Sequence, residues 1–137
     1  MVGYFIFMAG CLIMARSIKL KHVTLASNES ELSAQTECGK DILHIRYVAA
    51  EVGAAQSEPT RMLTDSKGAE AMSKRTLPTT KSRHVRLRDR WVQQLVAAKE
   101  AVVVHVQRAA MHADVLTHPV VGEFLRKCRD FLRAIFD

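Results

Sequence analysis

The chain has few cysteines, and no two of them are closely spaced. The three are Cys11, Cys38 and Cys128. A disulfide-stapled domain needs an even, regularly spaced set, and a thiolate zinc site needs Cys-x-x-Cys pairs. The histidines His105, His112 and His118 also lack zinc-ligand spacing. We therefore expect neither a disulfide framework nor a zinc site, and the cysteine usage favours a reducing, intracellular setting.

A long hydrophobic run is also missing. The most apolar stretch, residues 1–15, is shorter than the roughly 20 residues that a membrane-spanning helix needs, and no basic residues precede it as in a signal peptide. A signal or anchor segment is the alternative interpretation. The favoured one is a buried β-hairpin, because YFIFM (4–8) and CLIMA (11–15) are separated by Ala9-Gly10. We expect no membrane partner.

Glycine and proline are scarce, at six and three residues, and no internal repeat or low-complexity tract is visible. These absences exclude collagen-like and repeat architectures. The 137 residues suffice for a single domain, 1–137, and 48% apolar residues can build its core. The net charge of +6 favours a polyanionic partner.

The first half of the chain predicts short strands followed by a long helix. HVTLAS (22–27) is typical of a third short strand. Asn28 is a favourable N-cap for the helix, and Gly53 is a typical stop. Between them, apolar residues recur at helical spacing at Cys38, Ile42, Ile45, Ala49 and Val52. Glu31 lies seven residues before Cys38, so it shares that inward face.

The second half alternates strands and helices. The predicted elements are a strand at 61–65, helices at 66–75 and 82–100, a strand at 101–107, and helices at 112–117 and 120–136, split by Pro119. Trp91 falls on the apolar side of its helix, so we assign it to the core. This order predicts an α/β domain with helices packed on one mixed sheet of about four strands.

Three acidic residues stand where predicted elements begin or end. Glu31 lies in the first turn of the long helix, Asp65 ends a buried strand, and Asp114 opens a helix after the last strand. In an α/β sheet these positions form the site edge, where converging carboxylates could hold Mg²⁺, or Mn²⁺ in its place. Two such ions would clamp the attacking and leaving oxygens of a phosphodiester. The alternative is that Asp65 and Asp114 are only helix caps and Glu31 a solvated charge.

Basic residues gather at the start of the 82–100 helix. They are Lys81, Arg83, His84, Arg86, Arg88 and Arg90. Cations this close together favour a nucleic-acid phosphate backbone, in contacts that salt would weaken. The alternative is a solvated basic face.

Five segments resemble, in the same order, segments of the ribonuclease H domain of copia-type retrotransposons. SNESELSA (27–34) is similar to the family's S-T-E-A-E-Y-I-A, and MLTDSKGAEAMSK (62–74) to its C-D-N-x-S-A-x-x-L-x-x-N. KSRHVRLRDRWVQQLV (81–96) is similar to S-K-H-I-D-I-R-Y-H-F-I-R-E-x-V, and MHADVLTHPV (111–120) to Q-L-A-D-I-F-T-K-P-L. Residues 3–27 are similar to the hairpin S-G-Y-V-F-F-L-G-G-x-x-V-S-W-x-S-K-K-Q-x-x-V-A-L-S.

The resemblance implies a ribonuclease H-like mixed sheet flanked by helices, with a two-metal carboxylate site. Glu31 corresponds to the second acidic residue of S-T-E-A-E-Y, Asp65 to the strand-end aspartate, and Asp114 to the aspartate of A-D-I-F-T-K-P. The chain departs from the pattern at Leu32, where the family has tyrosine, and at His118, where it has lysine. The family's first catalytic aspartate, on the central strand just before the hairpin, has no counterpart in this sequence.

The implied function is that of one domain of a retrotransposon Pol polyprotein that includes a reverse transcriptase. In the complete protein it would use Mg²⁺ to hydrolyse the RNA strand of an RNA–DNA hybrid, in the cytoplasm or a virus-like particle. The 2′-hydroxyl would mark the strand to be cut. The alternative is a catalytically inactive, nucleic-acid-binding remnant of such an element.

Overall fold

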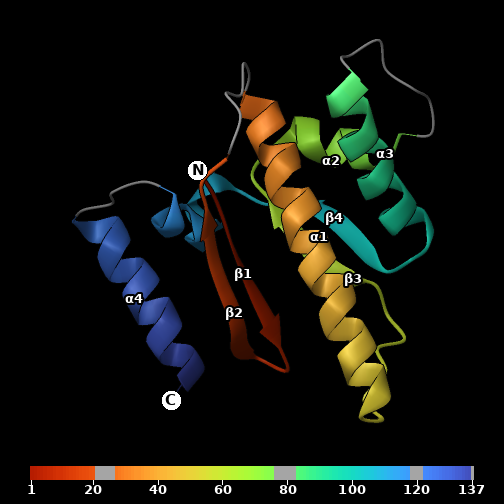
Figure 1. Ribbon diagram of the computed structural model, residues 1–137. Coiled ribbons are helices and arrows are strands. Elements are labelled where there is room, and N and C mark those ends of the chain that lie inside the picture. The colour runs from red at the N-terminus through yellow and green to blue at the C-terminus, as the bar shows by residue number, and fades with distance from the viewer. Residues whose placement is uncertain (21–26, 76–82, 118–121, 137) are drawn as a thin grey trace.

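The computed structural model describes residues 1–20, 27–75, 83–117 and 122–136 (Figure 1). The chain begins with a β-hairpin of β1 (Val2–Met8) and β2 (Cys11–Ile18), paired antiparallel. Ala9 and Gly10 both have positive φ, at 52° and 81°, as the two central residues of a tight hairpin turn require. The predicted hairpin is confirmed.

Helix α1 (Ser27–Glu51) follows, and Gly53, with a φ of 80°, ends its last turn as predicted. Two expectations about this helix are wrong. Asn28 lies inside the helix and not at its N-cap, because the helix already begins at Ser27. Val52 is 74% exposed, because the last turn extends past the core. Most of the predicted 22–27 strand lies outside the described residues.

Strand β3 (Thr60–Thr64) pairs in parallel with β4 (Ala101–His105), with Thr60 opposite Ala101. Between them run α2 (Lys67–Ser73) and α3 (Arg83–Ala97). These elements confirm the predicted order of the second half. A parallel pair needs such a helical crossover, because a tight turn cannot join two parallel strands.

Arg46 of α1 fixes the starts of the two parallel strands relative to the helix. Its guanidinium donates to Glu100 Oε2 at 2.6 Å, Thr60 Oγ1 at 3.2 Å, and the carbonyl oxygens of Gln56 and Glu58, each at 2.9 Å. Glu100 immediately precedes β4, and Thr60 opens β3. One side chain therefore holds three segments that are distant in sequence.

The chain continues with two short 3₁₀ segments, η1 (Arg108–Ala110) and η2 (His112–Leu116), and then α4 (Glu123–Phe136). The helix predicted at 112–117 is present over His112–Leu116, in the tighter 3₁₀ form. Phe131 of α4 stacks on His112, with ring centroids 4.0 Å apart, and meets Phe7 of β1 edge-on at 5.8 Å. Helix α4 therefore packs against the outer face of the hairpin at Phe7.

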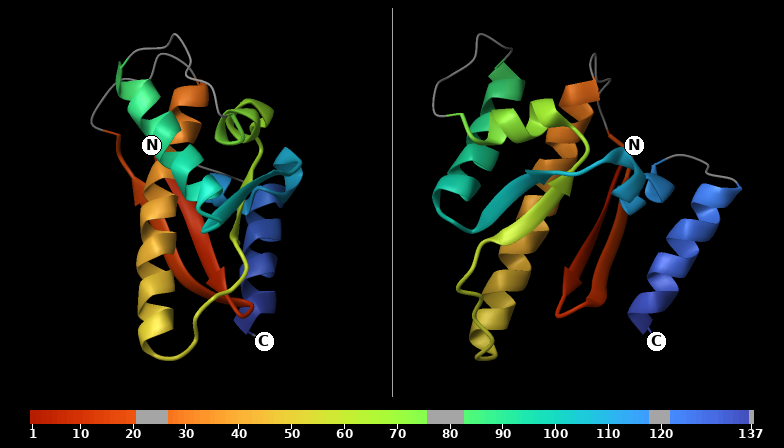
Figure 2. Two further views of the ribbon diagram at one scale, coloured as in Figure 1. Left: turned by 90° about the vertical axis from the view of Figure 1, so that its right-hand side faces the viewer. Right: turned by 180° about the vertical axis from the view of Figure 1, so that it is seen from behind.

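The described elements form an α/β arrangement with two two-stranded sheets, β1–β2 and β3–β4. The expected single sheet of about four strands is not formed, because no ladder joins β1 to β3. Helices α1 and α3 lie on one side of the strands and α4 on the other (Figure 2). The core joins both sheets to these helices through Tyr4, Ile6, Leu32, Ile42, Met62, Met72, Val92, Leu95, Ala101 and Val103. None of the described helices is long and apolar enough to span a membrane.

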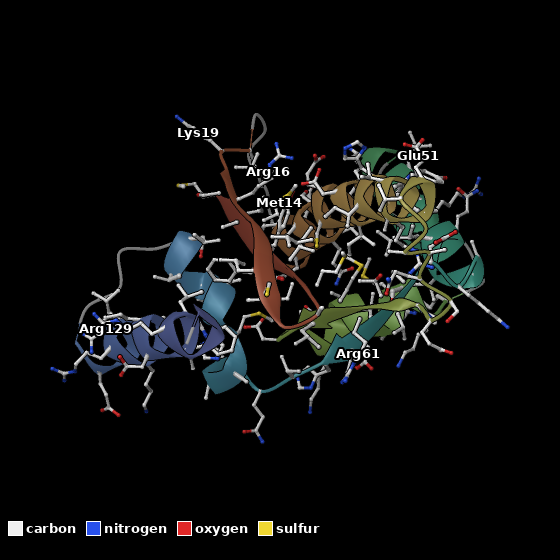
Figure 3. All side chains as sticks on the ribbon, turned by 90° about the horizontal axis from the view of Figure 1, so that it is seen from below. Met14, Arg16, Lys19, Glu51, Arg61 and Arg129 are labelled. Atoms are coloured by element: carbon white, nitrogen blue, oxygen red, sulfur yellow. The ribbon has the colours of Figure 1, made fainter. Side chains whose placement is uncertain are left out.

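The side chains of the two sheets differ in how they are covered. In Figure 3, Arg16 of β2 lies on the side that faces α1, where it donates to Asp41 at 2.8 Å. Tyr4, opposite Arg16 in the hairpin, donates to the same carboxylate at 2.5 Å. Arg61 of β3 lies on the side away from α1, and its neighbour Leu63 is 52% exposed. The hairpin thus contacts α1 on one face and α4 on the other, whereas the outer face of the β3–β4 pair is exposed at Leu63.

Candidate acidic site

A cavity of about 880 Å³ opens between β1, α1 and β3, and residues 106–117 close one end of it. Glu31, Asp65 and Asp114 all line this cavity. Three residues that are far apart in the sequence therefore meet in one space. They come from the start of α1, the end of β3 and the 3₁₀ segment η2.

The pKa of Glu31 is affected by the other two carboxylates. Burial raises its pKa first of all, and the negative charges of Asp65 and Asp114 raise it further. The Arg108 guanidinium opposes this shift. Because Asp65 and Asp114 both repel the ionised Glu31, a cation entering the cavity would relieve that repulsion.

Asp65 directly follows β3, but it does not cap the next helix. The N-cap of α2 is Ser66, whose Oγ accepts a hydrogen bond from the Ala69 backbone N–H at 3.1 Å. The capping function assigned to Asp65 in the alternative interpretation is thus supplied by its neighbour. The Asp65 carboxylate lines the cavity beside Ser66.

Asp114 lies in the first turn of η2, which is a short 3₁₀ helix. Arg108 Nε is 3.7 Å from Asp114 Oδ2, so the cavity carries its own positive charge. Gly3 allows η2 to approach β1, because a β-carbon at Gly3 would lie 2.6 Å from Leu116 Cβ. Ser17 Oγ holds the same segment by donating to the Leu116 carbonyl at 2.7 Å.

The three carboxylates supply the donor atoms that Mg²⁺ prefers. Mg²⁺ prefers oxygen ligands and keeps several waters. Among the described residues, no three histidine, cysteine, aspartate or glutamate side chains lie close enough to hold one ion. The carboxylates share a cavity without forming a ready ligand set, so Mg²⁺ or Mn²⁺ binding stays a prediction.

Two further residues of the cavity were not anticipated from the sequence. Arg108 is isolated in sequence, and nothing in its neighbours indicates that it approaches Asp114. Gln35 lies four residues after Glu31 on the same face of α1, and it is 6% exposed. Its side-chain amide nitrogen and oxygen are buried and have no hydrogen-bond partner among the described residues. The i, i+4 spacing from Glu31 was the available signal for Gln35.

The predicted basic cluster is only partly described. Lys81 lies outside the described residues, and of Arg83, His84, Arg86 and Arg88 only the backbone is described, in α3. Arg90 is exposed. Trp91, beside it, packs against the core as predicted. Nucleic-acid binding by this cluster stays a prediction.

Comparison with known proteins identifies a relative of the chain. Over 130 residues the chain is 27% identical to the Retrovirus-related Pol polyprotein from transposon TNT 1-94 of Nicotiana tabacum. The match covers 95% of this chain and 10% of that polyprotein, so the chain spans about a tenth of the relative's length. No family model matches the chain, and no solved structure matches it significantly. The similarity supports an origin in a retrotransposon Pol polyprotein.

Proposed function

We propose that the chain is a ribonuclease H-like domain of a retrotransposon Pol polyprotein. In the complete protein it would cleave the RNA strand of an RNA–DNA hybrid with Mg²⁺ or Mn²⁺. The observation that carries this proposal is the meeting of Glu31, Asp65 and Asp114 in one cavity. These are the three positions at which the resemblance to the copia-type domains predicts catalytic carboxylates.

A bound Mg²⁺ would supply a Lewis acid and an activated water. The residues of the chain itself would supply negative charge and a place for the phosphodiester. Burial and the two aspartates raise the pKa of Glu31, and a bound cation would act in the opposite direction and favour its ionised form. Arg108 lies next to Asp114, so its positive charge would compete with an incoming cation for the Asp114 carboxylate.

A gel assay of a labelled hybrid with Mg²⁺ or Mn²⁺ tests the proposal. It compares three proteins: residues 1–137, the chain extended upstream in its reading frame, and the extended chain with Asp65→Asn. We expect negligible cleavage by residues 1–137, clear cleavage by the extended chain, and loss of cleavage in the variant. Inactivity of all three would contradict the enzymatic proposal. Metal-dependent cleavage by residues 1–137 alone would show that no upstream residue is needed.

The second candidate is a nucleic-acid-binding remnant without catalysis. It is favoured by the lack of a three-residue metal group among the described residues and by Arg108 beside Asp114. The triple variant Arg83→Ala, Arg86→Ala and Arg88→Ala should then bind all nucleic-acid sequences more weakly. It should also flatten the dependence of affinity on salt by about one unit of slope per lost contact.

The matched control removes three exposed arginines from α4: Arg126, Arg129 and Arg133. It changes the net charge equally but leaves α3 intact. Equal weakening by both triple variants would show that net charge alone attracts the nucleic acid. An unchanged affinity in the α3 variant would show that its basic face is only solvated.

A further inference from the structure

The acidic cavity also carries positive charge among its lining residues. A nucleic-acid backbone that reaches the cavity meets the carboxylates of Glu31, Asp65 and Asp114. Phosphates and carboxylates repel each other, so such a backbone needs cations beside its path. Among the described residues that line the cavity, the lysine or arginine side chains are Arg61 and Arg108. We call these two residues the arginine rim.

Arg61 stands on the outer face of the β3–β4 pair. In Figure 3 it lies on the side away from α1. Leu63, two residues further along β3, shares that face and is 52% exposed. None of the ion pairs among the described residues involves Arg61, so its charge is available to an external anion. Asp65 follows four residues after Arg61, which is roughly 13 Å of extended chain.

Arg108 lies beside the carboxylates themselves. Its Nε is 3.7 Å from Asp114 Oδ2, which is longer than a hydrogen bond, and its side chain is 77% exposed. An exposed pair with this separation contributes little to stability. A guanidinium has five N–H donors. Arg108 can therefore stay close to Asp114 and donate to a phosphate oxygen at the same time.

The arginine rim differs in its place in the fold from the basic residues of α3. Helix α3 lies on the same side of the strands as α1 (Figure 2), whereas Arg61 lies on the other side (Figure 3). A backbone held by α3 alone would have no cationic contact on the outer face of β3. Phosphates of one duplex strand follow each other about every 3.4 Å along the axis, so roughly 13 Å of β3 spans about four nucleotides.

We propose that Arg61 and Arg108 position the sugar–phosphate backbone of an RNA–DNA hybrid along the outer face of β3, so that it leads to the carboxylates. This inference rests on the proposed function, which supplies the polyanionic partner. Both are positioning residues: Arg108 holds a phosphate next to the carboxylates, and Arg61 holds one about four nucleotides away. Arginine suits this role better than lysine, because its planar guanidinium can grip a phosphate through two parallel N–H bonds.

Fluorescence anisotropy of a labelled RNA–DNA hybrid in EDTA measures these contacts without any cleavage. The chain is compared with the double variant Arg61→Ala, Arg108→Ala. We expect the Kd to rise about tenfold at low salt and the salt slope to fall by about two, one for each lost phosphate contact. The matched control is Lys19→Ala, Arg75→Ala, which removes the same charge from two exposed residues that do not line the cavity. Its salt slope should be nearly unchanged.

A conservative variant separates the geometry of the contacts from their charge. The double variant Arg61→Lys, Arg108→Lys keeps both charges, so its salt slope should match that of the unaltered chain. Its affinity should lie between those of the unaltered chain and the alanine variant, because a lysine cannot form the bidentate contact.

Amide chemical shifts locate the bound backbone. Adding the hybrid should shift the Leu63 and Asp65 amides, which lie along the proposed path, and leave the Tyr47 amide near the far end of α1 unchanged. The same shifts should appear at saturation in the α3 triple variant, whose arginine rim is intact. They should disappear in the Arg61→Ala, Arg108→Ala variant.

Three results would overturn the inference. One is an equal loss of affinity and slope in the rim variant and its control, which would show that net charge alone attracts the hybrid. Another is hybrid binding that leaves the Leu63 and Asp65 amides unshifted. A third is a set of shifts that persists in the Arg61→Ala, Arg108→Ala variant. Each of these leaves nucleic-acid binding itself intact, whereas a lack of binding by the unaltered chain would contradict the proposed function as well.

Discussion

Glu31 carries a charge that the fold disfavours. Its pKa lies above the ordinary value of 4.5 because of burial and the nearby Asp65 and Asp114. The folded state therefore binds its proton more tightly than the unfolded state does. Well below pH 4.5 Glu31 is protonated in both the folded and the unfolded state, so it does not reduce stability. The free energy of unfolding then falls as the pH rises from about 4.5 through the folded-state pKa. We predict that Glu31→Gln raises the urea midpoint at pH 7 and leaves it nearly unchanged near pH 3.5. A lower midpoint at pH 7 would contradict this.

The pKa of Asp41 is shifted in the opposite direction to that of Glu31. Burial raises its pKa, but the hydrogen bonds from Tyr4 and Arg16 outweigh burial and leave the pKa below its ordinary value of 3.8. The ionised carboxylate therefore adds stability above pH 3.8 that is lost as the pH falls through the folded-state pKa. We predict that Tyr4→Phe costs about 1–2 kcal/mol of unfolding free energy at pH 7 and much less near pH 2, measured by urea unfolding. Tyr47→Phe, at a residue that is 64% exposed, is the control and should cost nothing measurable.

At the scale of single residues, sequence reasoning reached only those whose position follows from periodicity. Glu31 could be placed on the inward face of α1 because it keeps the helical phase of Cys38 and Ile42. Arg108 and Gly3 could not be found in this way. Their importance comes from the approach of η2 to β1, a contact between opposite ends of the chain that no local pattern encodes.

The packing of α1 on α3 depends on a glycine. A β-carbon at Gly39 would lie 2.8 Å from both Leu95 Cδ2 and Trp91 Cζ3. Alanine gains about 1 kcal/mol in helix propensity, whereas overpacking a core costs about 1–3 kcal/mol. We predict a net loss of about 1 kcal/mol for Gly39→Ala in urea unfolding. His44→Ala, at an exposed position of the same helix, has no such clash and should be neutral or slightly stabilising. Equal effects of both changes would show that Trp91 and Leu95 simply move aside.

Helices and strands were predictable where the residues of the segment itself determine its secondary structure. The hairpin follows from two apolar runs around Ala9-Gly10, and β4 follows from its β-branched residues. The helix expected at 112–117 forms, but as the 3₁₀ segment η2, which contacts both β1 and α4. The single sheet fails for a different reason: pairing of β1 with β3 would be a contact between strands far apart in the sequence, and no local pattern specifies such a contact.

At the scale of the whole molecule, the open edges of β1 and β3 favour self-association. Unpaired edges invite pairing with another chain. We predict that isolated residues 1–137 self-associate, with an average mass that rises with concentration in sedimentation velocity. Leu63→Pro should weaken this association, because the Leu63 N–H points to the open edge of β3 and not toward β4. Met62→Pro should unfold the protein instead, because Met62 is on the side of the β4 ladder. A monodisperse monomer with a sharp cooperative melt would contradict the prediction.

The contact of β1 with η2 also sets the order in which the molecule can form during synthesis. Domains fold as their residues leave the ribosome, N-terminal parts first. The hairpin emerges early, yet its outer face stays bare until α4 follows. Asp114 is likewise the last of the three carboxylates to arrive. The acidic cavity therefore comes together only after nearly all of the 137 residues have been made, and a ribosome stalled after β4 would hold a chain with a hairpin and no site.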